Sequence, residues 1–284
     1  MNSKTKSSTA ARLPRAKGID MATIYTPKEC ARKVKRIVLN DKNRTIVDEF
    51  ITILGMKEKF EEQDVPMPNK IVMFGPPGTG KTLTAFYIAQ RLELPLVLVR
   101  LDAIIHSHLG ETGSNVRKIF DFANATPCVL FLDEFDALGR MRDSSDEVKE
   151  MARVVNTLLQ CLDEFEGDSI FVAATNLEDE LDTAIWRRFD TKMTYGMPTE
   201  ADRLKYIELL VGSELSETGL SRQAADLLTG CSFADIEQIV LKAKRKSIIE
   251  DGVLDYNNIE NALSEYSPRI GHEHEKDLRD YLVQ

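Results

Sequence analysis

The chain has 284 residues, enough to bury a sizeable core in one large domain or two modest ones. Its formal net charge of -9 and isoelectric point near 5.2 argue against bulk affinity for nucleic acid or anionic membranes. No apolar run is long enough to span a bilayer, and the N-terminus lacks the apolar core of a signal peptide. The cysteines are widely spaced without a C-x-x-C pair, which predicts reduced thiols in a cytoplasmic protein: Cys30, Cys128, Cys161 and Cys231.

The start of the chain is basic, because residues 1–19 contain five lysines or arginines and no acid. We expect residues 1–24 to form a disordered basic tail, and a nucleic-acid-binding arm is the alternative for such a composition. Residues 25–43 are then expected to be a basic connector. Apolar side chains recur on one helical face over residues 44–60, which predicts an amphipathic helix that ends before Pro66 and Pro68.

A phosphate-binding pattern follows this helix. Lys70–Phe74 is a short apolar run that predicts a buried strand, and Leu83 begins a series of apolar residues at helical spacing. Between them the chain fits the pattern G-x-x-x-x-G-K-[ST] with Gly75, Pro76, Pro77, Gly78, Thr79, Gly80, Lys81 and Thr82. A glycine-rich loop at a helix N-terminus is an anion site, because unpaired amides and the positive end of the helix dipole point at the ligand.

The chemistry of this loop predicts that a nucleoside triphosphate binds to residues 75–82 and to Leu83, which follows them. We expect Lys81 to reach the β- and γ-phosphates and the Thr82 hydroxyl to ligate Mg²⁺. Gly78 and Gly80 allow the backbone to approach the ligand closely, because neither carries a Cβ atom.

Strand and helix patterns alternate after the loop. Strands are expected at residues 96–100, 128–132, 169–175 and 191–195, and helices at 114–125 and around 148–162. This alternation predicts an α/β fold with a parallel sheet covered on both faces. Only helical patterns follow, at residues 204–210, 223–228, 234–249 and 256–263. We therefore expect a large domain over residues 25–196, and a small helical domain with a C-terminal tail over residues 197–284.

Polar side chains end the predicted strands. Asp133 and Glu134 follow the strand at 128–132, and Asn176 follows the strand at 169–175. Because ligands bind at the carboxyl edge of open α/β sheets, Asp133 is expected to hold Mg²⁺ and Glu134 to act as the general base for water. Asn176 is suited to hold that water or the γ-phosphate, and Arg187 and Arg188 lie in a following loop. The acidic pair favours hydrolysis over phosphoryl transfer to a metabolite.

Over residues 35–265 these segments resemble the AAA proteins, within the AAA+ superfamily of ring-forming ATPases. The resemblance rests on GPPGTGKT, CVLFLDEFDAL, AATN, LDTAIWRRFD and GCSFADI, in that order. It implies a P-loop core with a five-stranded parallel sheet in an αβα arrangement, a small C-terminal α-helical lid, ATP and Mg²⁺ between subunits, and a homo-hexamer.

The resemblance also implies roles for single residues. By position, Lys81 and Thr82 are Walker A residues, and Asp133 and Glu134 are Walker B residues. Asn176 corresponds to sensor 1. The arginine finger corresponds to Arg188, with Arg187 as a second arginine, while Ala234 in the lid is expected near the nucleotide.

Three segments depart from the family pattern. The finger loop is shorter than in many relatives, so either arginine remains a candidate for the finger. Phe233 stands where the lid motif usually has glycine. His108 stands where an aromatic residue of the first pore loop usually grips an unfolded substrate, and we expect His108 and Leu109 to make that grip.

These observations lead to one principal hypothesis: a cytoplasmic ring ATPase that remodels or partly unfolds a protein partner and so disassembles its complexes. The chain is similar to compact bacterial AAA proteins, which include relatives of the pachytene-checkpoint remodellers that act on HORMA-domain proteins in cyclic-oligonucleotide anti-phage defence. Two alternatives stay open: a DNA-associated loader or regulator that uses the basic tail, and a nucleotide-switched scaffold or chaperone for a separate protease.

Overall fold

The computed structural model describes residues 15–16, 19–99, 112–135, 145–176, 183–212 and 219–266. The chain divides into two compact units. The sheet unit contains the described residues up to Lys35, Asp41–Gly75 and Lys81–Thr194. The helical unit contains Arg36–Asn40, Pro76–Gly80 and the chain from Tyr195 onwards.

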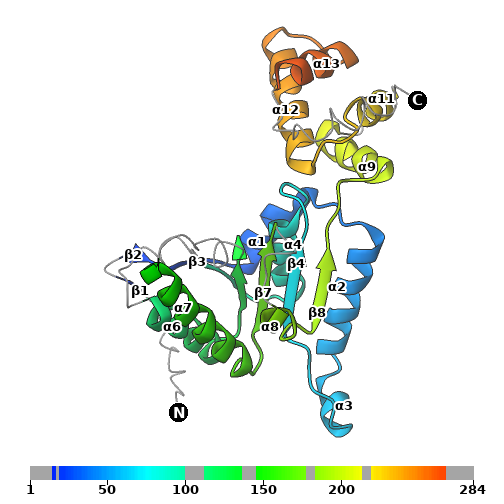
Figure 1. The fold of residues 1–284 in the computed structure, drawn as a ribbon. Coiled ribbons are helices and arrows are strands. Elements are labelled where there is room, and N and C mark those ends of the chain that lie inside the picture. The colour runs from blue at the N-terminus through cyan, green and yellow to red at the C-terminus, as the bar shows by residue number, and fades with distance from the viewer. Residues whose placement is uncertain are drawn as a thin grey trace, which may run out of the picture. The chain divides into compact units, whose positions relative to one another are not determined.

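The sheet unit is built on six strands in the order β3-β5-β6-β7-β4-β8 (Figure 1). They are β3 (Ala22–Tyr25), β4 (Lys70–Phe74), β5 (Leu96–Val99), β6 (Val129–Leu132), β7 (Ile170–Thr175) and β8 (Thr191–Thr194). The last five pair in parallel, which confirms the α/β P-loop core expected from the alternating pattern. Strand β3 adds an antiparallel edge that the sequence analysis did not predict.

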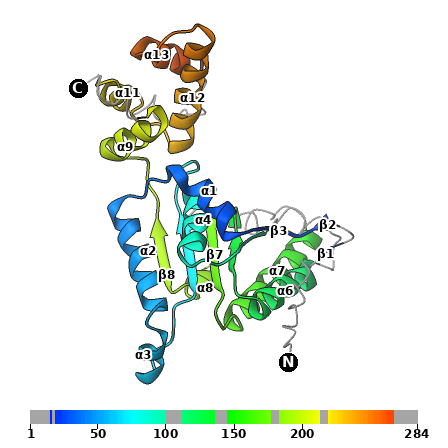
Figure 2. The same cartoon turned by 180° about the vertical axis from the view of Figure 1, so that it is seen from behind.

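Helices cover both faces of this sheet (Figures 1 and 2). Their bounds are α1 (Pro27–Lys33), α2 (Asp41–Leu54), α3 (Lys57–Glu62), α4 (Lys81–Arg91), α6 (Thr112–Ala125), α7 (Ser145–Asp163) and α8 (Thr183–Trp186). Helices α1 and α4 pack together on one face, and α6 and α7 pack on the other. A short 3₁₀ helix, η1 (Val34–Arg36), follows α1, and β1 (Arg15–Ala16) pairs antiparallel with β2 (Ile19–Asp20).

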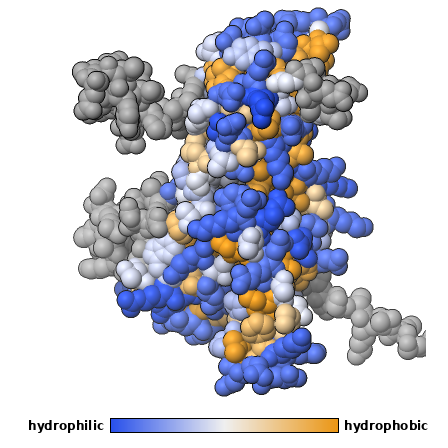
Figure 3. All heavy atoms as spheres, turned by 90° about the vertical axis from the view of Figure 1, so that its right-hand side faces the viewer, coloured by the Kyte–Doolittle hydropathy of each residue, from blue (hydrophilic) through white to orange (hydrophobic). Residues whose placement is uncertain are grey.

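The face drawn in Figure 3 is mainly hydrophilic, with hydrophobic patches between hydrophilic side chains. Within the described ranges, no helix combines the length and the hydropathy that a membrane span requires.

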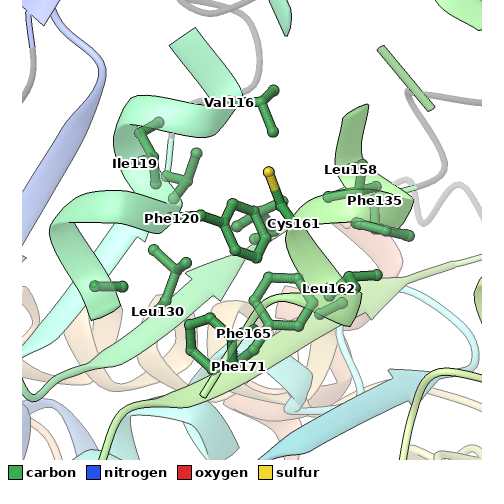
Figure 4. Close-up of a cluster of buried hydrophobic side chains, with 14 of the residues drawn as sticks. Val116, Ile119, Phe120, Leu130, Phe135, Leu158, Cys161, Leu162, Phe165 and Phe171 are labelled. Atoms are coloured by element: carbon green, nitrogen blue, oxygen red, sulfur yellow. The ribbon is translucent and has the colours of Figure 1, made fainter. Parts of the chain in front are cut away.

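The core of the sheet unit lies between the sheet and helices α6 and α7 (Figure 4). Alternate residues of β5, β6 and β7 point into it, as the two-residue period of a strand requires. The rings of Phe120, Phe165 and Phe171 meet there, with centroids 5.3 to 6.0 Å apart. This apolar layer holds the parallel strands in register, so that their carboxyl ends meet along one edge.

The N-terminal part of the sheet unit corrects two expectations. Disorder was expected throughout residues 1–24, but Ala22–Tyr25 is a strand with Met21 and Ala22 buried in the core. The segment 25–43 was expected to be a connector, but it contains helix α1. The missed signal is a capping box, in which Thr26 and Glu29 bond each other's backbone amides and Pro27 occupies the first turn.

The single helix expected over residues 44–60 is two helices. Helix α2 begins at Asp41 and ends at Leu54, and α3 begins at Lys57. The chain turns at Gly55, whose amide bonds the Ile51 carbonyl at 3.1 Å, before the Met56 amide bonds that of Ile53 at 2.9 Å. Helix α3 extends beyond the sheet at the far end of α2 (Figures 1 and 2).

The helical unit consists of α9 (Glu200–Val211), α11 (Leu220–Leu227), α12 (Phe233–Ile249) and α13 (Tyr256–Glu265). Each corresponds to a helical pattern predicted from the sequence. Capping boxes at Thr199, Ser232 and Asp255 begin three of these helices. The core of this unit also takes in Val38, so the short segment Arg36–Asn40 packs with the helices.

Candidate active site

Lys81 is the buried cation at the carboxyl edge of the sheet. It is 6% exposed, and its Nζ donates to the Gly75 carbonyl at 2.6 Å and to Asn176 Oδ1 at 2.8 Å. Gly75 follows β4 and Asn176 follows β7, and these two strands are neighbours in the sheet. Register therefore brings an ammonium and an amide together although 95 residues separate them.

Thr82 and Asp133 form the second contact at this edge. The Thr82 hydroxyl donates to Asp133 Oδ2 at 2.7 Å. Thr82 lies in the first turn of α4, and Asp133 directly follows β6. The two oxygen ligands predicted for Mg²⁺ thus lie side by side.

Glu134 stands next to Asp133 in a left-handed backbone conformation, with φ of +52°. Its amide donates to Asp133 Oδ1 at 3.0 Å, and its side chain is exposed. Left-handed φ is uncommon for residues other than glycine, and such strain is concentrated at functional sites. Phe135 is fully buried directly afterwards, which holds the strained turn against the core.

The loop Pro76–Gly80 makes its contacts within the helical unit. The Gly78 carbonyl accepts from the Ala234 amide at 3.2 Å. A Cβ atom at Gly78 would lie 2.5 Å from the Ser232 hydroxyl oxygen, and φ there is +73°, so both space and conformation require glycine. Ala234, expected near the nucleotide, thus touches the phosphate loop.

Phe233, the departure from the family motif, packs edge-on against Tyr206 with ring centroids 5.1 Å apart. Asp235 lies two residues further along the same first turn of α12, and it accepts from the Ser232 hydroxyl at 2.6 Å and the Tyr266 hydroxyl at 2.7 Å. Burial raises the pKa of Asp235, but these hydrogen bonds outweigh it and leave the pKa below its usual value. The carboxylate therefore stays ionised and anchors the start of α12.

The two candidate finger arginines have different surroundings. Arg188 donates Nε and Nη2 to the two carboxylate oxygens of Asp163, at 2.7 and 2.8 Å, and Nη1 to the Ala184 carbonyl at 2.7 Å. Hydrogen bonding from Arg188 lowers the pKa of Asp163. Arg187 is exposed, and its guanidinium makes no hydrogen bond or ion pair with the described residues.

The residues at the sheet edge fit a nucleotide and a magnesium ion. Mg²⁺ prefers oxygen ligands and is usually held by one or two carboxylates together with waters and substrate phosphates. Thr82 and Asp133 supply such oxygens, and the Lys81 ammonium beside them suits phosphate. Within the described ranges, no group of three or more His, Cys, Asp or Glu side chains forms an all-protein metal cage.

Several residues named from the sequence lie outside the described residues. These are His108 and Leu109 of the first pore loop, and the basic residues of the tail up to Arg12. Conversely, sequence reasoning missed Asp163, the last residue of α7, as the partner of Arg188. Asp163 and Arg188 are 25 positions apart in the chain, so no local sequence pattern marks this pairing.

The chain resembles one known protein family and many individual proteins. The model described as "ATPase family associated with various cellular activities (AAA)" matches residues 71–197. The uncharacterized AAA family ATPase y4kL of Sinorhizobium fredii is 41% identical over 233 residues, which cover 79% of this chain and 70% of that protein.

Longer proteins match over a smaller share of their length. The proteasome-activating nucleotidase of Methanopyrus kandleri is 33% identical over 221 residues, covering 75% of this chain and 51% of that protein. The ATP-dependent zinc metalloprotease YME1 homolog of Caenorhabditis elegans is 32% identical over 219 residues, covering 75% and 30% respectively. The chain therefore spans about half of the nucleotidase and less than a third of the metalloprotease.

Proposed function

The chain belongs to the AAA family of ATPases, and from this premise we propose that it forms a homo-hexameric ring that uses ATP hydrolysis to remodel a protein partner. The observation that carries the proposal is the pair of contacts at the sheet edge, Lys81 to Asn176 and Thr82 to Asp133. They join three strand ends and a helix N-terminus into one polar cluster. Such an arrangement is suited to a triphosphate and its attacking water.

In this proposal each polar residue has one task. Lys81 neutralises charge on the β- and γ-phosphates, and the amides of the glycine loop hold the phosphate oxygens. Thr82 and Asp133 would hold Mg²⁺, and the bound ion would supply positive charge beside the phosphates. Glu134 takes the proton of the attacking water, and Asn176 orients that water against the γ-phosphate.

The arginines supply charge to the site of a neighbouring subunit. The contacts of Arg188 favour Arg187 as the residue that reaches across, because the bidentate pair with Asp163 already engages Arg188. Arg188 then holds α8 against the end of α7 so that Arg187 points outward. This reverses the order of the two arginines implied by the family resemblance.

We propose a protein as the partner because the names of related chains refer to proteins that they act on. Examples are the proteasome-activating nucleotidase and the zinc metalloprotease. We propose His108 and Leu109 as the residues that grip it. The overall resemblance to compact bacterial AAA proteins makes a HORMA-domain protein in anti-phage defence the first partner to test.

The cysteines support a reducing compartment, and we propose the cytoplasm. All four thiols are free and buried: Cys30, Cys128, Cys161 and Cys231. Burial raises the pKa of Cys128 and of Cys161 to about 11, so both stay protonated and unreactive near neutral pH.

The first test is ATP hydrolysis with Mg²⁺ by the purified chain, alone and with candidate partners. Lys81→Ala is expected to abolish nucleotide binding, whereas Lys205→Ala, a matched change at an exposed lysine, should leave it intact. Failure of the wild-type chain to hydrolyse ATP or to assemble under all these conditions would contradict the proposal.

The second test uses Glu134→Gln as a trap, because the carboxamide still accepts a hydrogen bond but cannot act as the base. The variant is isolated from its native host with ATP present, and bound molecules are identified by mass spectrometry. A stoichiometric folded protein supports remodelling, and a HORMA-domain protein supports the specific partner. Recovery of DNA would favour a loader, and rings without any partner would favour a nucleotide-switched scaffold.

A further inference from the structure

The residue before the proposed finger contacts the strand that leads into the phosphate loop. Trp186 is the last residue of α8 and directly precedes Arg187. Its ring meets the Phe74 ring edge-on, with centroids 5.1 Å apart and an angle of 87° between the planes. Lys192 of β8 places its Nζ 5.8 Å from the centre of the Trp186 ring. The aromatic side chain next to the finger is therefore in contact with β4 and β8 together.

The same segment is bound to the beginning of β4. The Asp190 carboxylate accepts from the amides of Asn69 and Lys70, both at 3.0 Å. The Asp190 amide donates to the Lys70 carbonyl at 3.1 Å. Phe74 is the last residue of β4, so contacts at both ends of this strand hold residues 186–190 against it.

The side chains on either side of Arg187 are also anchored. Ile185 and Phe189 are 4% and 5% exposed and belong to the core of the sheet unit. Arg188 is engaged by Asp163, whereas Arg187 is exposed. A functional side chain keeps its geometry when packing locks the residues that support it. Arg187 thus extends from a segment whose other members are fixed.

Phe74 also connects this segment to the candidate active site. Gly75 directly follows Phe74, and its carbonyl accepts from Lys81 Nζ at 2.6 Å. Only Phe74 and Gly75 lie between the Trp186 ring and the cation that is proposed to bind phosphate. The support of Arg187 is therefore built on the base of the phosphate loop in its own subunit.

We propose that Trp186 is a positioning residue for ATP hydrolysis, because its contact with Phe74 holds Arg187 where it reaches the nucleotide of the neighbouring subunit. The inference rests on the proposed ring and on Arg187 as its finger. Trp186 touches no reacting group and acts only through Arg187. Such support matters because a displacement of about 1 Å caused far from the chemistry can lower the rate about a hundredfold.

This role predicts that the effect of Trp186 appears in a different subunit. Trp186 and Arg187 serve the active site of the neighbour, whereas Lys81 and Glu134 serve their own. Loss of the Trp186 ring should therefore lower hydrolysis in the neighbouring site and leave ATP binding to its own subunit intact. A side chain that only stabilised the fold would not divide its effects in this way.

The test mixes two variants of the full chain. Trp186→Ala removes the ring but keeps the complete active site of its own subunit. Glu134→Gln removes the proposed base but keeps Trp186 and Arg187. The variants are mixed before ATP and Mg²⁺ are added, and ATP hydrolysis is compared with that of each variant alone. Circular dichroism checks folding, sedimentation velocity checks assembly, and a fluorescent nucleotide measures affinity.

Trp186→Ala alone is expected to lower kcat about a hundredfold with ATP affinity unchanged. The mixture should recover up to about a quarter of the wild-type rate, because half of the subunits keep the base and half of these receive a finger from a Glu134→Gln neighbour. Trp186→Phe should restore most of the activity, since it keeps a ring against Phe74. If Trp186→Ala fails to fold, Trp186→Leu takes its place, because leucine keeps an apolar side chain but no ring.

Three controls accompany the mixture. Phe122→Ala removes another partly buried aromatic side chain from the same core, so it should lower stability and leave kcat unchanged. Trp186→Ala mixed with the double variant Trp186→Ala and Glu134→Gln should stay inactive, because no subunit then presents a positioned finger. Arg187→Ala mixed with Glu134→Gln should recover activity as the Trp186→Ala mixture does.

Two results would overturn this inference and leave the proposed function standing. One is a Trp186→Ala chain that hydrolyses ATP at the wild-type rate. The other is a Trp186→Ala mixture that stays inactive while the Arg187→Ala mixture recovers. Loss of ATP binding in Trp186→Ala would also overturn it, since Trp186 would then act on its own subunit.

Two further results would reach the proposed function as well. If neither mixture recovers, Arg187 does not act across subunits, and both the finger and its support by Trp186 are refuted. A wild-type chain that does not hydrolyse ATP would refute the proposed function itself.

Discussion

The two units of this protein use polar side chains in opposite ways. In the helical unit, the bonds that begin α9, α12 and α13 join residues three positions apart in the chain, as between Ser232 and Asp235. In the sheet unit, the bonds at the active edge join residues far apart, as between Thr82 and Asp133, 51 positions away.

This difference separates stability from chemistry. A capping box satisfies amides that its own helix leaves unpaired, so its contribution is local. The sheet-edge contacts exist only when the parallel strands are in register, so they report the integrity of the whole sheet. Changes at the sheet edge are therefore expected to remove activity, and changes in the helical unit to reduce stability.

The largest effect is expected at Glu134. Replacement of its carboxylate in Glu134→Gln removes the proposed base and should lower kcat by about 10²- to 10⁴-fold while ATP still binds. Steady-state hydrolysis and fluorescent-nucleotide binding measure the two quantities separately. Glu166→Gln, at an exposed acid outside the sheet edge, is the control. Turnover at the wild-type rate would remove Glu134 from the role of base.

The next largest effect is expected from the arginine pair, Arg187 and Arg188. Replacing these arginines tests whether a residue that lies outside the sheet edge contributes to hydrolysis there. Arg187→Ala is expected to lower kcat by about a thousandfold with ATP affinity unchanged, as for loss of an arginine finger. Arg188→Ala and Asp163→Ala should have smaller and similar effects, because each breaks the same bidentate pair. A larger loss for Arg188→Ala would return the finger role to Arg188.

Gly78→Ala tests the phosphate loop, which belongs to the helical unit. The added Cβ meets the Ser232 hydroxyl at 2.5 Å, so both stability and nucleotide affinity should fall. Gly219→Ala is the matched control, since its φ of +74° equals that of Gly78 within a degree but nothing lies within 4 Å of the new atom. Both variants carry a conformational cost of roughly 1–2 kcal/mol. Equal free energies of unfolding for Gly78→Ala and Gly219→Ala would show that the close contact with Ser232 is unimportant.

The smallest effect is expected from Tyr266→Phe in the helical unit. It removes one hydrogen bond to Asp235 and should lower the free energy of unfolding by about 1 kcal/mol. The folded-state pKa of Asp235 lies below its ordinary value of 3.8. The stability that this hydrogen bond contributes is therefore present at pH values above 3.8. It is lost as the pH falls through the folded-state pKa.

Urea denaturation at neutral and acidic pH measures this dependence. The difference between wild type and Tyr266→Phe should narrow as the pH falls below the ordinary value of the carboxyl. Tyr256→Phe, the same change at the first residue of α13, serves as the control. A difference that does not change with pH would separate the Tyr266 bond from the charge of Asp235.

Helices and strands with strong patterns were predictable from the sequence. Lys70–Phe74 is an uninterrupted apolar run and forms β4 over those same residues, and the helical patterns after residue 200 all became helices. Helix α1 and strand β3 were missed because a basic composition concealed them. The capping box at Thr26 was the available signal for α1, whereas β3 depends on pairing with β5, which is distant in sequence.

The sequence alone determined the family, the α/β core and the residue types of the active edge, because a phosphate loop and an acid-ended strand have specific spacing and chemistry. Tertiary structure decided which of these groups touch, through the register of β4, β6 and β7. It also separated Arg188, paired with Asp163, from the exposed Arg187. Adjacent residues look equivalent in a sequence, and only the packing of α7 against the segment after α8 distinguishes them.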